Sequence, residues 1–246
     1  MLDSIKINKK IKQLRERKNL TQSELADILG ISNMTMQGFE RGNNMPDISK
    51  LPKLMELFDV PLEEIIGDEA GIEIIKSFIN DDFENYRGSH NITSEEFVNI
   101  APILKPNQVD SVFDSLAIPL TVEELSMSAP FIKTDRLDVM AGNIYDKSGL
   151  NSIVFIAPFI SDELINKYSK ETFEKSGLNS LTSMAPFIGK ELINECAIKS
   201  YEKNSTNDLT SMAPFISKDV LNDIAKRAIN EHGLKSIQSI LPFVDK

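Results

Sequence analysis

The sequence has 246 residues, of which 41 % are hydrophobic and 26 % charged, values typical of folded globular chains, and its net charge is −10. One cysteine, Cys196, and two histidines, His90 and His232, exclude an intrachain disulfide and a zinc site of the usual ligand spacing, so we expect no metal or other cofactor. No apolar run approaches the ~18 residues of a membrane span and no secretion signal is evident, so we expect a cytoplasmic protein without membrane contact.

The charge is unevenly distributed along the chain. Residues 1–20 contain seven basic side chains against two acidic ones, whereas residues from Gly67 onward contain 17 basic and 27 acidic ones. This asymmetry favours a phosphate-facing N-terminal part on a body that repels nucleic acid. The alternative is that the basic residues are simply the solvated side of a helix.

Three helices are predicted in the first 41 residues. The apolar spacing of Ile7, Ile11 and Leu14 predicts a helix over 7–18. Thr21 and Glu24 form a capping-box pattern that begins a helix over 22–29, which Gly30 ends. Ser32 then caps a helix over 33–41.

That third helix has Met36 and Phe39 on its inner side, and it follows the second after a turn of three residues.

The stretch from Thr21 to Asp47, TQSELADILGISNMTMQGFERGNNMPD, resembles the helix-turn-helix of Xre and Cro repressors. The resemblance continues through residues 48–60 and a last short helix at Leu62–Ile66, so it covers about a quarter of the chain. It implies an all-α fold that begins with a five-helix DNA-binding domain over residues 1–68.

The resemblance also implies which residues contact double-stranded DNA, because the helix after Ser32 enters the major groove in that family. Gln22 matches a phosphate contact. Asn33, Met34 and Gly38 match base-reading positions, Thr35 and Gln37 lie beside them, and Arg41 and Asn43 follow near phosphate. Asn33 is the strongest candidate, since a carboxamide can pair with adenine twice. Gly38 departs from the usual polar residue and offers little contact, and each of these residues could instead be an ordinary exposed helix position.

A second pattern fills the remainder of the chain. Ala-Pro-Phe or a close variant begins at Ala101, Ala129, Ala157, Ala185, Ala213 and Leu241, always 28 residues apart. This period predicts an α-helical solenoid of two-helix repeats over residues 69–246. The degraded segment over residues 71–91 indicates a first repeat adapted to meet the N-terminal domain.

One repeat shows the expected construction. Ser161 caps a long helix that Gly177 ends, and Asn179 begins a shorter helix that Pro186 stops or kinks. Cys196 occupies an inner position, which favours a core residue over a redox sensor.

Two features of the repeats leave alternatives open. The asparagines at two registers, Asn166, Asn194 and Asn222 and also Asn151, Asn179 and Asn207, could receive a peptide, or could form caps and bonds between repeats; caps are favoured for the second set. The apolar residues of the last unit, Ile237, Ile240, Leu241, Phe243 and Val244, either pack on a second copy or fold back on their neighbour.

These observations favour a sequence-specific transcriptional regulator, a repressor that binds a pseudo-palindromic operator as a homodimer. The repeats would then serve oligomerisation or bind a signal or a protein partner. The alternative is an interaction scaffold, such as an antitoxin-like or phage-immunity component, that the N-terminal domain tethers to DNA. Catalysis is not expected, because the sequence lacks a nucleophile–base set and a phosphate-binding glycine loop.

Overall fold

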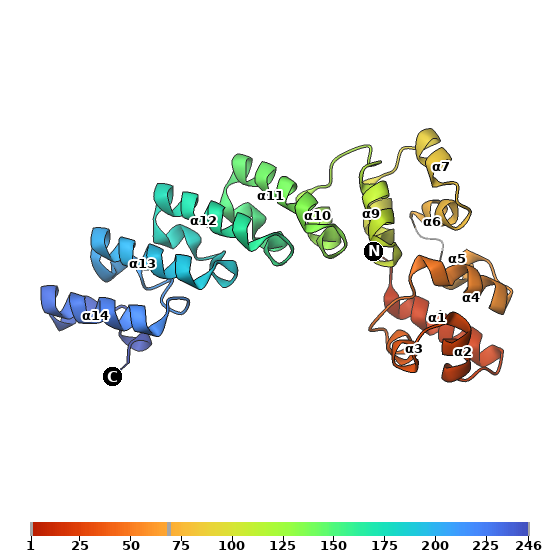
Figure 1. Cartoon of the computed structure of the whole chain (residues 1–246), viewed down its shortest axis with the longest axis horizontal. Coiled ribbons are helices and arrows are strands. Elements are labelled where there is room, and N and C mark those ends of the chain that lie inside the picture. The colour runs from red at the N-terminus through yellow and green to blue at the C-terminus, as the bar shows by residue number, and fades with distance from the viewer. Residues whose placement is uncertain (1, 68–69, 246) are drawn as a thin grey trace. The chain divides into compact units, whose positions relative to one another are not determined.

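The computed structural model describes residues 2–67 and 70–245, and the chain forms two compact units, residues 1–133 and 134–246 (Figure 1). In the described residues the elements are helices and turns, apart from an isolated bridge between Ile92 and Leu116. The predicted all-α class is therefore confirmed. The expected boundary between residues 68 and 69 falls inside the first unit, and it stays a prediction of where the N-terminal domain ends.

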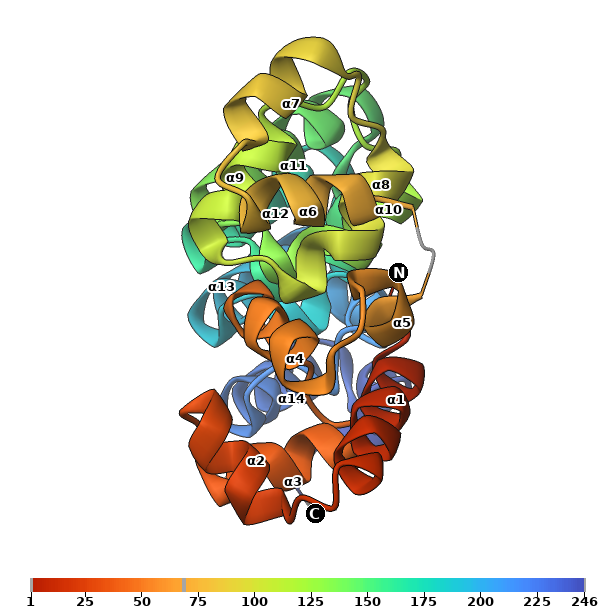
Figure 2. The ribbon, with the colours of Figure 1, turned by 90° about the vertical axis from the view of Figure 1, so that its right-hand side faces the viewer.

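The first unit opens with five α-helices, as predicted: α1 Ser4–Arg17, α2 Gln22–Leu29, α3 Asn33–Glu40, α4 Leu51–Phe58 and α5 Leu62–Ile66. We call residues 2–67 the head. In it α1 packs beside α5 and α3, and α2 packs beside α3 (Figure 2). Apolar side chains at helical spacing meet between these helices, so that Ile11, Leu25, Met36 and Leu54 expose at most 1 % of their surface.

Local hydrogen bonds set the ends of α2 and the start of α3 where the sequence predicts them. The Glu24 backbone N–H donates to Thr21 Oγ1 at 3.2 Å, and the Thr21 backbone N–H donates to Glu24 Oε2 at 2.7 Å. Gly30 ends α2 in the left-handed region with φ 64°. Ser32 Oγ accepts from the Thr35 backbone N–H at 3.1 Å and caps α3.

The first unit continues with shorter helices: α6 Ile72–Ile79, α7 Phe83–Ser89, α8 Ser94–Ile100, η2 Ala101–Ile103, α9 Pro106–Phe113, α10 Val122–Ser128 and η3 Ala129–Phe131, where η denotes a 3₁₀ turn. This segment packs on the head through α6, which contacts the 3₁₀ turn η1 at Ile48–Lys50, and through polar contacts. The Leu2 backbone N–H donates to the Asn99 carbonyl at 3.2 Å, and Lys76 Nζ lies 2.5 Å from Glu63 Oε1. These contacts agree with the expectation that the start of the repeats is adapted to the N-terminal domain.

The second unit contains four long helices whose first residues are 28 positions apart in the sequence: α11 Thr134–Ser148, α12 Asp162–Ser176, α13 Lys190–Asn204 and α14 Lys218–His232. Short 3₁₀ segments follow each helix: η4 Leu150–Phe159, η5 Leu178–Leu181 with η6 Ala185–Phe187, η7 Ser205–Asp208, and η8 Leu234–Ile237 with η9 Leu241–Phe243. Helix α12 packs on α13, and α13 packs on α14 (Figure 1). This order is the one that a solenoid of 28-residue units requires.

The second element of a repeat differs from the short α-helix that the sequence predicts. Between Gly177 and Ile188 the chain forms two 3₁₀ turns, η5 and η6, rather than one helix from Asn179. Pro186 is the second residue of η6 and does not stop a helix. A prolyl residue fits this place because the first residues of a helix have no internal acceptor for an N–H.

Side chains of the long helices bind the backbone of the next repeat. The acceptor is Oδ1 in every case: Asp138 accepts from Ser161 N at 2.8 Å, Asn166 from Gly189 N at 2.8 Å, Asn194 from Ser217 N at 2.9 Å and Asn222 from Asp245 N at 2.9 Å. In the other register, Ser183 and Ser211 donate to the carboxamide oxygens of Asn151 and Asn179. Both registers thus form bonds between repeats, which corrects the cap role favoured for Asn151 and Asn179.

Burial changes along the second unit. Cys196 is 1 % exposed and belongs to the core, as expected. Leu150 and Leu178 begin their 3₁₀ segments and expose 3 % and 1 % of their surface, whereas Leu234 at the same register exposes 70 %. Leu241 exposes 54 %. The last described repeat therefore presents an apolar surface where preceding repeats are covered.

Candidate nucleic-acid interface

Helix α3 has one buried face and one exposed face. Met36 and Phe39 are 0 % and 5 % exposed and form part of the core, as predicted. The residues expected to contact DNA from this helix lie elsewhere on it: Asn33, Met34 and Gln37 are exposed, and Thr35 and Gly38 are half-buried. Met34 exposes 82 % of its surface, although methionine is usually buried. The outward face of α3 is therefore uncharged and able to hydrogen-bond.

Helix α2 orients the side chain of Asn33. The Asn33 Nδ2 group donates to Ser23 Oγ at 3.3 Å. A carboxamide has two N–H groups and one carbonyl oxygen. The bond to Ser23 therefore uses one donor and leaves a donor and an acceptor, which is what the major-groove edge of adenine requires.

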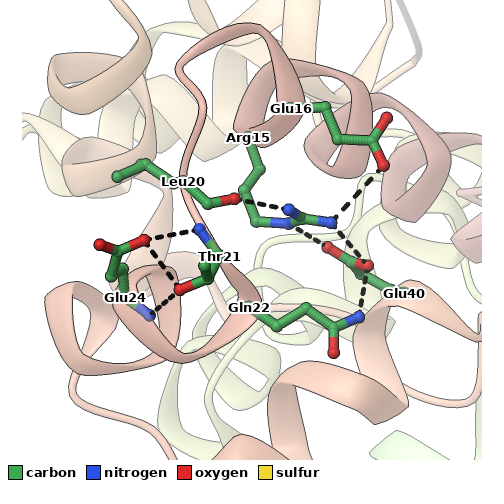
Figure 3. Close-up of polar contacts among 7 residues, drawn as sticks. All are labelled: Arg15, Glu16, Leu20, Thr21, Gln22, Glu24 and Glu40. Atoms are coloured by element: carbon green, nitrogen blue, oxygen red, sulfur yellow. Dashed lines mark hydrogen bonds and ion pairs between the residues drawn. The ribbon is translucent and has the colours of Figure 1, made fainter.

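A network of polar contacts anchors the C-terminal end of α3 to α1 and α2 (Figure 3). Arg15 donates from Nε and Nη2 to the two Glu40 oxygens at 2.6 and 3.1 Å, and from Nη1 to the Leu20 carbonyl at 2.6 Å. Gln22 Nε2 donates to Glu40 Oε2 at 2.7 Å. The Glu40 and Arg15 side chains are only 4 % and 10 % exposed, so the pair lies inside the head.

This network involves Gln22, an expected phosphate contact, and Arg15, one of the seven basic residues of the N-terminal 20. Gln22, the expected phosphate contact, already uses one amide N–H on Glu40, and its second N–H is the group that could reach a phosphate. Arg15, counted above among the N-terminal basic residues, is a buried structural partner. The sequence reasoning missed the Arg15–Glu40 pair because the two residues are 25 positions apart.

The ionisation of Glu40 follows from its surroundings. Burial raises the pKa of the Glu40 carboxyl, but the hydrogen bonds from Arg15 and Gln22 and the positive charges of Arg15 and Lys12 together outweigh that effect and hold the pKa below its ordinary value. The hydrogen bond to Glu40 in turn raises the pKa of Arg15 above its ordinary value. Both groups are charged at neutral pH, so the anchor of α3 is an ion pair.

The other basic residues of α1, together with its C-cap Lys18, fall into two sets. Some face a carboxylate: Lys10 Nζ and Arg17 Nη1 lie 3.0 and 3.6 Å from Glu64 Oε1 and tie α1 to α5, and Lys6 Nζ lies 3.8 Å from Asp3 Oδ2. The others, Lys9, Lys12 and Lys18, are exposed. The positive charge available to a phosphate is thus smaller than the sequence count suggests.

The loop after α3 contains a residue that the sequence reasoning did not single out. Arg41 and Asn43 are exposed there, as a phosphate contact requires. Asn44 is also exposed, and its Nδ2 lies 2.8 Å from the place that a Cβ at Gly38 would occupy. The sequence signal that could have pointed to Asn44 was Gly38, a residue without a side chain on an otherwise polar helix face.

Two helices joined by the three residues Gly30 to Ser32, with the second helix presenting hydrogen-bonding side chains outward, are the arrangement of a helix-turn-helix. The head is therefore a helix-turn-helix domain. Its core, its caps and the Arg15–Glu40 pair hold the outward face of α3 in place.

Comparison with known proteins agrees with this class. The helix-turn-helix family model matches residues 11–65. The HTH-type transcriptional regulator AnsR of Bacillus subtilis is 37 % identical over 60 residues, and the cryptic phage CTXphi transcriptional repressor RstR of Vibrio cholerae is 32 % identical over 59 residues. The HTH-type transcriptional activator BcrR of Enterococcus faecalis is 32 % identical over 73 residues.

These similarities cover less than a third of the chain. They cover 24 % of this chain for AnsR and RstR and 30 % for BcrR, and they span 52 %, 53 % and 36 % of those three proteins respectively. Residues 11–65 match the helix-turn-helix family model, and proteins to which the chain is similar are HTH-type regulators, in agreement with the Xre resemblance. No solved structure matches the chain.

Two further observations concern other classes of site. Within residues 2–67 and 70–245, His, Cys, Asp and Glu form no group of three or more that could hold a metal ion. None of the helices in the described part of the chain has the length and apolar character needed to span a bilayer.

Proposed function

We propose that this chain is a cytoplasmic, sequence-specific transcriptional regulator that represses by covering its operator. The observation that carries the proposal is the outward face of α3, where hydrogen-bonding side chains stand exposed on a helix that the Arg15–Glu40 pair anchors to the core. Exposed carboxamide and hydroxyl groups on a rigid helix suit the reading of base edges, because they can donate to and accept from the groups that bases present in the major groove. The similarity of residues 11–65 to transcriptional regulators supports the same function.

In this proposal α3 enters the major groove with its first turn leading. Asn33 pairs with adenine through the donor and acceptor that Ser23 leaves to it, and Met34 contacts a thymine methyl group. The remaining contacts follow the expectation from the sequence: Thr35, Gln37 and Gly38 lie beside the bases, and Gln22, Arg41 and Asn43 face the phosphates.

Selection of bound sequences from a random duplex pool tests the proposal. Wild type should enrich a half-site, and Asn33→Ala should lose about 1–3 kcal/mol at one base position with a smaller loss on random DNA. Asn107→Ala, the same change at an exposed position of α9, serves as the matched control and should enrich the wild-type half-site. Failure of the wild-type protein to bind any duplex at low salt would refute the proposal.

We further propose a homodimer, which places two α3 helices about one DNA turn apart on a pseudo-palindrome. The exposed Leu234 and Leu241 support it, because Leu150 and Leu178 at the register of Leu234 are buried under the next repeat. If the same surface of a second copy packs against it, the contact is the self-complementary one of a twofold dimer. Leu234→Lys should then shift the sedimentation coefficient toward the monomer, and a folded variant that stays dimeric would contradict this interface.

A further inference from the structure

Gly38 leaves a gap in the outward face of α3, and a side chain from another element fills it. Gly38 follows Met34 by four residues, so the two positions share one face of the helix. A Cβ built on Gly38 would lie 2.8 Å from Asn44 Nδ2 and 3.7 Å from Asn44 Cγ. The Asn44 carboxamide therefore occupies the space in which a side chain of residue 38 would begin.

The backbone that carries Asn44 is held by bonds to two other elements. The side chain of Asn8, which is 1 % exposed, donates from Nδ2 to the Asn44 carbonyl at 2.7 Å. The Asn43 backbone N–H donates to the Gly38 carbonyl at 3.0 Å. Gly42 takes the left-handed conformation with φ 81°, which lets the chain turn back over α3. A buried anchor on α1 thus fixes the position from which the exposed Asn44 side chain extends.

An exposed carboxamide on an anchored backbone has the properties of a base-reading group. It offers a donor and an acceptor on a short side chain, so little conformational entropy is lost when it pairs with a base. It also lies against the helix face that carries Met34, at the end where Gly38 has no side chain of its own. We infer that Asn44 reads the major-groove edge of a base, adenine by preference, in place of residue 38. This inference rests on the proposed function of the head.

The test uses the full chain in the same random-pool selection. Asn44→Ala should lose preference at one base position, different from the position lost in Asn33→Ala, and should bind the selected operator about 5- to 100-fold more weakly. Asn43→Ala, the neighbouring expected phosphate contact, should instead weaken all sequences by a similar factor and leave the salt dependence of binding unchanged, because asparagine carries no charge.

A double-mutant cycle separates a reading role from a general effect on the fold. Gly38→Ala adds a methyl group 2.8 Å from Asn44 Nδ2 and displaces that flexible amide, while alanine favours the helix. Gly38→Ala should therefore weaken operator binding in the wild-type chain and have little effect when Asn44 is already alanine. Circular dichroism of each variant shows whether the head remains helical.

Three results would overturn the inference. An unchanged base preference in Asn44→Ala shows that this side chain reads nothing. A loss that is equal on all sequences makes Asn44 a phosphate contact. A wild-type chain that selects no half-site removes the proposed function and this inference with it, whereas a wild type that selects a half-site unaffected by Asn44→Ala removes the inference alone.

Discussion

Replacement of Glu40 by glutamine removes the negative charge that balances Arg15 inside the head. The two side chains are 4 % and 10 % exposed and share two hydrogen bonds of 2.6 and 3.1 Å. Glutamine keeps the size of the side chain and one acceptor oxygen. The substitution therefore tests the charge of the pair rather than its volume.

The expected magnitude follows from the burial of Arg15. Removal of one partner of a buried pair costs about 3–5 kcal/mol, because the other charge stays buried without compensation. Arg15 keeps its bond to the Leu20 carbonyl and lies 3.6 Å from Glu16, so the loss should fall at the lower end, about 3 kcal/mol. A free-energy loss of that size corresponds to an opening equilibrium about 100-fold more favourable.

Hydrogen exchange of the full chain measures this opening locally. Backbone amides of α3 and of the adjoining turn should lose about 100-fold protection in Glu40→Gln, whereas the long helices α11 to α14 should keep theirs. Glu16→Gln is the matched control, since Glu16 faces the same arginine but is 54 % exposed, and it should cost less than about 1 kcal/mol. Equal protection in both variants would refute the view that the Glu40 charge anchors α3.

The pH dependence provides a second readout of the same pair. The pKa of Glu40 in the folded chain lies below its ordinary value, so its contribution is present at neutral pH and is lost as the pH falls through that lowered pKa. Wild type should therefore lose protection in α3 as the pH falls below the ordinary pKa of a glutamate and through the lowered pKa of Glu40, and Glu40→Gln should lose less protection over the same range. The same loss of α3 protection at low pH in both proteins would contradict the view that Glu40 is the group that titrates.

Two further predictions concern the repeats. Burial, with a contribution from Glu195, raises the pKa of Cys196 to about 11. The thiol should therefore react with a disulfide reagent at pH 8 only as fast as the chain opens. Rapid labelling of the native protein would contradict the position of Cys196 in the core. Asn194→Ala removes the acceptor 2.9 Å from the Ser217 backbone nitrogen, and urea denaturation should show a free energy of unfolding lower by about 1–2 kcal/mol. Asn207→Ala, at an exposed position, should lower it by less than about 0.5 kcal/mol. Equal losses in the two variants would contradict the role of Asn194 between repeats.

Features that depend on neighbours in the chain could be predicted from the residues alone. The capping box at Thr21, the left-handed Gly30 and the cap at Ser32 involve partners within a few positions, so the amino acids themselves specify the turn between α2 and α3. The core positions Met36 and Phe39 followed from helical spacing. The 28-residue period could also be read from the sequence, because each repeat packs on its neighbours through similar residues at equivalent positions.

Contacts between distant positions could not be predicted in this way. Asn8 and Asn44 are 36 residues apart, and Gln22 and Glu40 are 18 apart, so each pair forms only once the helices have packed and brought two backbones to a particular distance. The same packing turned the short helix expected from Asn179 into 3₁₀ turns, because the local preference for either form is weak and burial decides between them. Composition and spacing therefore specified which helices form and which faces are apolar, whereas the three-dimensional packing of those helices determined which polar side chains remain free to meet DNA.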